Sequence, residues 1–173
     1  PRITRGECYF SIGMSEPDSG SDLASVRTRA EPVSGGFRVN GTKVWTSGAH
    51  RNHYCITLVR TSGQHGDRHK GLSQLLVDLK TPGVTIRPII NLAGRHDWNE
   101  VTFSDAFIPE DCLIGNEGDG WLQVTSELAF ERSGPERFMQ NVYVLRELIR
   151  VLGRQPAKRA SAIVGRLIAR LWT

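Results

Sequence analysis

Short apolar runs alternate with polar turns over the first two thirds of the chain. The runs are rich in β-branched and aromatic residues, and glycine, proline or asparagine separates many of them. This pattern is typical of β-strands joined by turns. We therefore expect residues 1–118 to form a mainly β domain, an antiparallel barrel or sandwich. The expected strands are Tyr9–Met14, Ala24–Ala30, Gly36–Val39, Lys43–Thr46, His53–Arg60, Leu72–Asp78, Val84–Ile90 and Glu100–Phe107.

Turn residues indicate how these strands connect. Asn40-Gly41 lies between two of the runs, and this dipeptide favours a two-residue hairpin turn because both residues tolerate a positive φ. We therefore predict a hairpin between residues 36–39 and 43–46. Ser34-Gly35-Gly36 and Pro82-Gly83 are expected to form further turns.

The pattern changes to that of helices after a glycine-rich stretch at residues 115–120. Residues 121–131 contain no glycine or proline, and apolar residues then recur at three-and-four spacing. We expect Gly153 and Pro156 to end the amphipathic helix that this spacing predicts. A second apolar stripe follows. The two stripes are Phe138, Val142, Leu145, Leu148, Ile149 and Leu152, and Ile163, Val164, Leu167, Ile168, Leu171 and Trp172.

Residues 119–173 are therefore expected to be the first helices of an α-helical bundle domain. A few helices beside a β domain cannot bury all of their apolar faces, so we expect the sequence to be part of a larger protein.

Composition places the chain among globular proteins. Of its 173 residues, 39% are hydrophobic and 23% charged, and the net charge is +4. Cys8, Cys55 and Cys112 form no CxxC pair, and their odd number argues against a disulfide framework, which fits the cytoplasm. No apolar run is long enough to insert into a membrane. Basic residues outnumber acidic ones after residue 130, and such a segment could bind nucleic acid. A solvated helix face is the favoured interpretation, so no nucleic-acid partner is expected.

Two loops carry the candidate chemistry. The first, Met14-Ser15-Glu16-Pro17-Asp18-Ser19-Gly20-Ser21-Asp22, follows an apolar run, and its backbone N–H groups and hydroxyls suit a phosphate or the edge of a flavin. The second is Asn40-Gly41-Thr42-Lys43-Val44-Trp45-Thr46-Ser47-Gly48-Ala49. In this order and spacing, the two loops resemble the paired flavin-binding signatures of the acyl-CoA dehydrogenase family.

The resemblance continues through Thr81–Val84, Leu92–Gly94, Glu100–Phe103, Ile108–Gly115 and Glu117–Trp121. It implies the middle β domain and the beginning of the C-terminal helical domain of that family. It also implies α,β-dehydrogenation of an acyl-CoA substrate, in which a carboxylate removes the α proton and the β hydride passes to N5 of FAD. A homo- or hetero-oligomer, and an electron-transferring flavoprotein as electron acceptor, are further expectations.

The resemblance also implies site residues. Ser15 is expected near the flavin pyrimidine ring, Trp45 on the isoalloxazine, and Ser47 near N5. Ser21 is expected to contact both the cofactor and the thioester arm of the substrate. The expected FAD contacts are Ile12, Met14, Ser15, Gly20, Ser21, Trp45, Thr46 and Ser47.

Phe130-Glu131-Arg132 resembles the position of the catalytic base in members that act on branched or bulky acyl chains, including steroid side chains. Glu131 is then the expected base and Arg132 a substrate contact. Two alternatives stay open. Glu131 could be a surface residue paired with Arg132, and the base could lie in a later part of the C-terminal domain.

One family feature is missing. An Arg-x-x-Phe-Gly segment, which in typical members helps to hold the FAD of a neighbouring subunit, is not found after Glu131. A non-catalytic partner subunit of a hetero-oligomeric dehydrogenase is therefore an alternative function, and an acyl-CoA oxidase on the same fold is another. His96 and Asp97, together with His50 or His53, lack the spacing of metal ligands, so no metal is expected.

Overall fold

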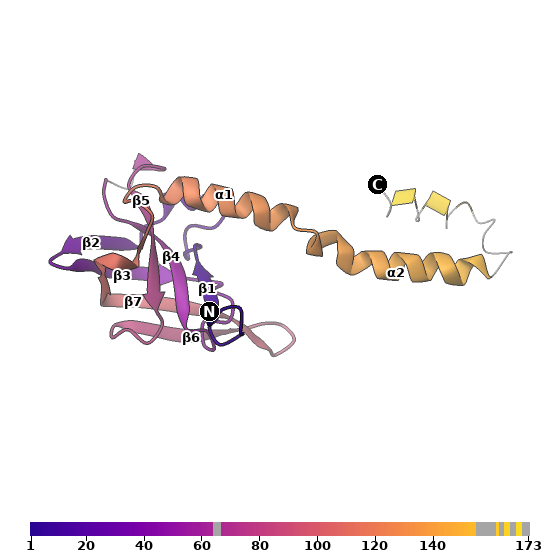
Figure 1. Cartoon of the computed structure of the whole chain (residues 1–173), viewed down its shortest axis with the longest axis horizontal. Coiled ribbons are helices and arrows are strands. Elements are labelled where there is room, and N and C mark those ends of the chain that lie inside the picture. Colours follow the sequence, from indigo (N-terminus) through magenta and orange to yellow (C-terminus); the bar gives the residue numbers. More distant parts are fainter. Residues whose placement is uncertain (64–66, 155–161, 163–164, 167–168, 171–173) are drawn as a thin grey trace. The chain divides into compact units, whose positions relative to one another are not determined.

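The computed structural model describes residues 1–63, 67–154, 162, 165–166 and 169–170 (Figure 1). The chain divides into two compact units, Pro1–Thr125 and Ser126–Thr173. All of the described strands lie in the first unit, and the described part of the second unit is mainly helical, so the mainly β class with helices after it is confirmed. The strands are β1 (Phe10–Gly13), β2 (Arg29–Val33), β3 (Gly36–Lys43), β4 (Tyr54–Arg60), β5 (Leu72–Asp78), β6 (Val84–Ile90), β7 (His96–Pro109) and β8 (Leu113–Ile114).

All of these strands belong to one sheet, in the order β6-β7-β3-β2-β4-β5-β8, with β1 beside β4. β4 and β5 run across the direction of β3 and β7, so the sheet turns a corner (Figure 1). Most pairs are antiparallel, as expected, but β1 and β2 both pair with β4 in parallel. They follow each other along the same edge of β4: β1 pairs with Tyr54–Thr57 and β2 with Arg60.

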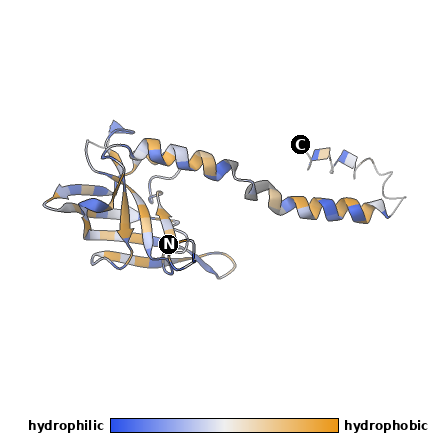
Figure 2. Cartoon of the chain, in the orientation of Figure 1, coloured by the Kyte–Doolittle hydropathy of each residue, from blue (hydrophilic) through white to orange (hydrophobic). Residues whose placement is uncertain are grey.

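The core lies inside this bend. Strands β2, β3, β4, β5 and β7 each contribute fully buried apolar side chains, whereas β6 is largely exposed. Buried and more exposed positions alternate along much of β7, as a half-buried strand requires, whereas β4 and β5 are buried at consecutive positions. Hydrophobic and hydrophilic residues both occur along the strands (Figure 2). The core residues are Ala30, Phe37, Val39, Ala49, Cys55, Val59, Leu75, Val77, Leu79, Val101, Phe103, Ala106 and Ile108.

The predicted hairpin at Asn40-Gly41 is wrong. Both residues lie inside β3, which runs on to Lys43, and the turn between β2 and β3 is Ser34-Gly35. The Asn40 side chain accepts a hydrogen bond from the backbone of Asp105 on β7 (2.8 Å), and β3 carries an irregularity between Val39 and Gly41. A glycine with positive φ therefore marks a bulge here and not a chain reversal.

Two other expected strands are displaced. Of the run Lys43–Thr46, only Lys43 belongs to a strand. The run Ala24–Ala30 begins as a short 3-10 helix, η1 (Leu23–Ser25), and reaches β2 only at Arg29. The Arg60 guanidinium at the end of β4 explains this shape, because it donates to the carbonyls of Ala24 and Val26 and holds that segment out of the ladder.

The helices follow η3 (Glu110–Cys112) and β8, and they confirm the expected change of pattern. α1 spans Gly120–Ser133 and α2 spans Glu136–Gly153. A Cβ on Gly120 would lie 2.6 Å from the backbone nitrogen of Ser73, so only glycine allows α1 to begin against β5. The second apolar stripe, from Ile163 to Trp172, lies mostly outside the described residues. Among the helices that the structure describes, none has the length and apolar character of a membrane span.

Gly41→Ala tests the bulge. Gly41 has a φ of +145°, and a Cβ there would lie 2.6 Å from Thr28 Oγ1, so we expect the free energy of unfolding to fall by about 3 kcal/mol. Gly35→Ala is the matched control, because Gly35 also has a positive φ but open space around it. It should cost only about 1 kcal/mol. Urea denaturation of both variants gives the comparison, and equal losses would contradict the steric argument.

Candidate functional site

Three backbone segments lie side by side at the expected flavin loops. The central segment, residues 43–47, continues β3 beyond its last ladder residue. On one side Val44 N donates to Ser15 O (2.9 Å), and on the other Thr46 and Asn99 exchange two backbone hydrogen bonds (3.0 and 3.1 Å). We call the segments 14–16, 43–47 and 97–99 together the platform. Its hydrogen bonds bring together residues that lie far apart in sequence.

Trp45 stands at the centre of the platform in an unusual conformation. Its φ is 60°, in the left-handed region that bulky residues rarely occupy, and 59% of its surface is exposed. The hydrogen bonds of Val44 and Thr46 on either side hold this conformation. The Trp98 ring meets Trp45 edge to face, with ring centroids 6.2 Å apart. Strained residues that the surrounding structure holds in place concentrate at ligand sites.

The residues around Trp45 fit a flavin. The exposed indole offers a flat apolar surface, and the hydroxyl-bearing residues Ser15, half-buried, and Ser47, exposed, stand on the platform beside it. Ser47 is fixed through its carbonyl, which accepts a hydrogen bond from Ser11 Oγ (2.8 Å). Thr46 is fully buried, and its Oγ1 has no hydrogen-bond partner within the described part of the chain. A planar ring system with one polar edge matches this combination.

A buried ion pair holds the two flavin loops together. Lys43 Nζ lies 2.9 Å from Glu16 Oε1 and also donates to the carbonyl of Met14 (3.0 Å). The Glu16 carboxylate accepts two further hydrogen bonds, from the backbone N–H groups of Arg27 (2.7 Å) and Thr28 (2.8 Å). The Lys43 side chain is 0% exposed. The sequence analysis gave Glu16 and Lys43 no role, although Glu16 belongs to the first loop motif and Lys43 to the second.

Burial and attraction act in opposite directions on the Glu16 carboxyl. Burial alone would raise the pKa of Glu16, but Lys43 and the N–H donors outweigh it, so this pKa lies below its ordinary value of 4.5. For Lys43, burial lowers the pKa and the Glu16 charge opposes that shift. The carboxylate therefore stays ionised at neutral pH, and its charge holds the ammonium.

The first loop closes tightly behind this ion pair. Glu16 and Ser19 exchange backbone hydrogen bonds of 2.8 and 3.1 Å around Pro17-Asp18, and Ser19 Oγ donates to Asp22 O. The remaining expected contacts lie along the same stretch. Met14 is half-buried, and Ile12, Gly20 and Ser21 are exposed.

A second polar cluster, which the sequence analysis also missed, supports Thr46 from the other side. The fully buried Asn99 donates through Nδ2 to Thr46 O (2.9 Å). Its Oδ1 is the shared partner of His50 Nδ1 (3.2 Å) and His96 Nε2 (2.7 Å), whose rings stack 3.8 Å apart. Within the described residues, no three His, Cys, Asp or Glu side chains gather closely enough to hold a metal ion.

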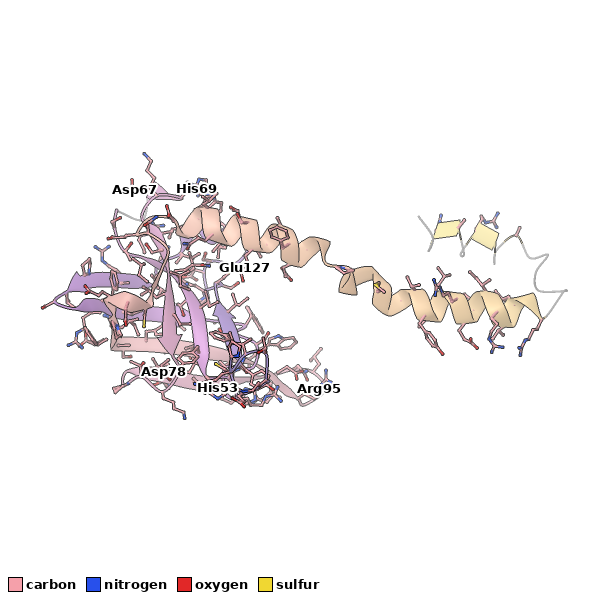
Figure 3. The ribbon with its side chains drawn as sticks, in the orientation of Figure 1. His53, Asp67, His69, Asp78, Arg95 and Glu127 are labelled. Atoms are coloured by element: carbon pink, nitrogen blue, oxygen red, sulfur yellow. The ribbon has the colours of Figure 1, made fainter. Side chains whose placement is uncertain are left out.

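Glu131 and Arg132 lie on the exposed surface of α1, in the second unit. Glu127, one turn earlier on the same helix, is labelled in Figure 3. The roles of Glu131 and Arg132, and those of the expected flavin contacts, stay predictions.

Comparisons with known proteins agree with this architecture. Residues 11–106 match the family described as acyl-CoA dehydrogenase, middle domain. The chain is 42% identical over its whole length to "Acyl-CoA dehydrogenase IpdE1" of Mycobacterium tuberculosis, of which it covers 45%. It therefore spans about half the length of this curated relative.

Two solved structures resemble this one. A variant of the "Tcur3481-Tcur3483 steroid ACAD" has a TM-score of 0.85 and 28% identity, covering 98% of this chain and 44% of that one. The "FAD complex of PigA" has a TM-score of 0.64 and 31% identity, covering 70% of this chain and 32% of that one.

Lys43→Met should strongly destabilise the first unit, Pro1–Thr125. The substitution leaves the buried Glu16 carboxylate without its counter-ion, which costs about 3–5 kcal/mol, and Glu16→Gln added to it should recover part of the loss. Arg68→Met is the control, because it breaks the exposed 2.7 Å pair with Asp22 and should change stability by less than about 1 kcal/mol. Urea denaturation measures all of these variants. A double variant less stable than Lys43→Met would contradict the assignment.

The Glu16 carboxylate should also make stability depend on pH. Its pKa is lowered in the folded state, so its contribution is complete above the ordinary value of 4.5 and is lost as pH falls through the lower folded value. The stability difference between the natural chain and Glu16→Gln should therefore shrink in acid. Denaturation series from neutral pH to about pH 3 follow this difference, and a constant difference would show that folding does not lower the pKa of the Glu16 carboxyl.

Proposed function

Because the chain belongs to the acyl-CoA dehydrogenase family, we propose that it provides the flavin platform of an enzyme that dehydrogenates an acyl-CoA between its α and β carbons. The observation that carries this proposal is Trp45, exposed and held in a left-handed conformation between the segments of Ser15 and Asn99. That arrangement presents an aromatic surface that is ordered before any ligand arrives. Pre-ordering reduces the loss of freedom on binding.

Each platform residue has a proposed role toward FAD. The Trp45 ring packs against the isoalloxazine, Ser15 binds its pyrimidine end, and Ser47 hydrogen-bonds close to N5. Bound FAD supplies the acceptor for the hydride that leaves the β carbon. Ile12, Met14, Gly20, Ser21 and Thr46 complete the proposed set of contacts, and Ser21 also meets the thioester arm of the substrate.

Glu131 is the proposed base. Its carboxylate takes the α proton while the β hydride leaves, so the substrate loses two electrons and two hydrogens and gains a double bond. Arg132 beside it is proposed to contact the substrate. Burial of the carboxylate in the assembled site would raise its pKa and make it a stronger base.

The proposed substrate is an acyl-CoA with a branched or bulky acyl group. The position of Glu131 next to Arg132 supports this, and so does the likeness to a structure named a steroid ACAD. We further propose that the protein is an oligomer that passes electrons to an electron-transferring flavoprotein. The three free thiols fit the reducing cytoplasm in which we propose that it acts.

A second candidate function is that of a non-catalytic partner subunit in a hetero-oligomeric dehydrogenase. The missing Arg-x-x-Phe-Gly segment favours it, because that segment would complete the flavin site of a neighbouring subunit. The two-part name of the Tcur3481-Tcur3483 neighbour is in line with it. Flavin content separates the two functions, since a non-catalytic subunit binds FAD poorly. An oxidase would differ in its reaction with oxygen, on which the platform gives no specific observation.

Glu131→Gln in the full-length protein tests the proposed base. The variant should keep its FAD but lose flavin reduction by substrate, with a rate lowered by at least about 10²–10⁴-fold. The measurement is anaerobic titration with straight-chain, branched and steroid side-chain acyl-CoAs, followed in the visible flavin band. Bleaching by one class names the substrate.

Glu127→Gln is the matched control, because it removes a carboxylate from the same helix one turn away. Substrate should reduce the flavin of this variant at the same rate as in the natural protein. Normal reduction in the Glu131→Gln variant would assign the base to another residue. Absence of FAD from the natural protein would contradict the flavin proposal itself.

A further inference from the structure

An open apolar cleft of ≈ 580 Å³ lies beside Trp45, between that ring and the end of the β6–β7 hairpin. Three large apolar side chains in it are strongly exposed, Ile90 at 57%, Trp45 at 59% and Leu92, which is exposed fully. Exposed apolar side chains that gather in one place usually mark a binding surface. The loop between the two strands carries Arg95, labelled in Figure 3. The cleft is lined by Trp45, Ile89, Ile90, Asn91, Leu92, Ala93 and Trp98.

The order of the backbone segments places this cleft relative to the hydroxyls of the platform. Ser15 lies on one side of the 43–47 segment, through the hydrogen bond from Val44. Asn99, and with it Trp98, lies on the opposite side, through the two bonds with Thr46. β6 follows next, because Ile89 pairs with Trp98. The surface therefore changes from polar at Ser15, across Trp45, to apolar at Trp98 and Ile89.

This gradient has the dimensions of a three-ring system. Neighbouring segments in a sheet lie about 4.8 Å apart, so the platform from Ser15 to Trp98 spans about 10 Å. The isoalloxazine has the same asymmetry, with a polar pyrimidine ring at one end and an apolar dimethylbenzene ring at the other. A flavin whose pyrimidine ring meets Ser15 and whose middle ring covers Trp45 extends its dimethylbenzene ring toward Trp98.

We propose that the cleft receives the dimethylbenzene end of the flavin and that Trp98 is a specific contact for it. This inference rests on the proposed function and adds a residue that neither flavin loop contains. Trp98 is suited to the role because its backbone is fixed on both sides. Its neighbour Asn99 is fully buried and bonded to Thr46, and Ile89 stands opposite it on β6.

The test compares two cofactors on the full-length protein. FAD and 7,8-didemethyl-FAD, which lacks the two ring methyl groups, are titrated onto the apoprotein while protein and flavin fluorescence are recorded. Trp98→Ala should weaken FAD binding about tenfold, the usual size of a lost aromatic contact. It should weaken binding of the didemethyl analogue clearly less, because the analogue has lost part of the same contact.

Three variants accompany it. Trp98→Phe should restore most of the affinity for FAD. Ile90→Ser changes an exposed position of the cleft and keeps the test open if Trp98→Ala folds poorly. It should also weaken binding of FAD more than binding of the didemethyl analogue. Phe107→Ala is the control, because it removes another partly exposed aromatic ring from β7, stacked with Arg38 at the other end of the strand, and should leave both affinities unchanged.

The outcomes are distinct. Equal losses for both flavins in Trp98→Ala and in Ile90→Ser would overturn the proposal, because these residues would then act only through the fold. Unchanged FAD affinity together with a changed oligomeric state in sedimentation would also overturn it and assign the cleft to a subunit contact. Failure of the natural protein to bind either flavin would instead contradict the proposed function.

Discussion

The candidate site depends on one buried ion pair, Glu16–Lys43. A fully buried ammonium is tolerated only when its charge and donors are satisfied, and here the Glu16 carboxylate and the Met14 carbonyl do this. The carboxylate in turn needs donors, which it finds in the backbone of Arg27 and Thr28. The pair thus joins three segments that no ladder connects directly. It fixes the first loop against the end of β3, directly before the segment that carries Trp45, so the position of the platform follows from it.

The sheet topology makes room for this ion pair. β1 and β2 share one edge of β4, and the chain leaves the sheet between them to form the first loop. Glycine at the end of β1 leaves space there, since a Cβ on Gly13 would crowd Cys55 Sγ at 3.0 Å and Lys43 Cγ at 3.4 Å. Burial raises the pKa of the Cys55 thiol to about 11, so it stays neutral beside the lysine and adds no competing negative charge. The Met14 carbonyl, Gly13 and the neutral Cys55 thiol thus surround the Lys43 side chain.

Local pattern was enough to predict much of the fold. The class, the runs that became β4, β5 and β6, the turn at Ser34-Gly35 and the helix ending at Gly153 all follow from periodicity and turn residues within short windows. The errors arose where distant residues decide the structure. Asn40-Gly41 reads as a hairpin, but Thr28 and Asp105 pack and bond there and make it a bulge. The parallel partners of β4 are likewise set by the contacts of β1 and β2, which no local pattern contains.

The site shows the same division between residues that pattern can identify and residues that only geometry can. Motif resemblance singled out Ser15, Trp45 and Ser47, and the fold brings their segments together, although their roles remain proposals. It passed over Lys43, Glu16 and Asn99, because a charged or amide side chain in a short strand or a polar loop is read as solvent-facing. Each of the three is buried, and each bonds the backbone or side chain of another platform segment. The residues that prepare the surface are therefore less visible in the sequence than those that form it, since their function is carried by long-range contacts. Glu131 presents the opposite situation: the sequence names it, and its role remains a proposal.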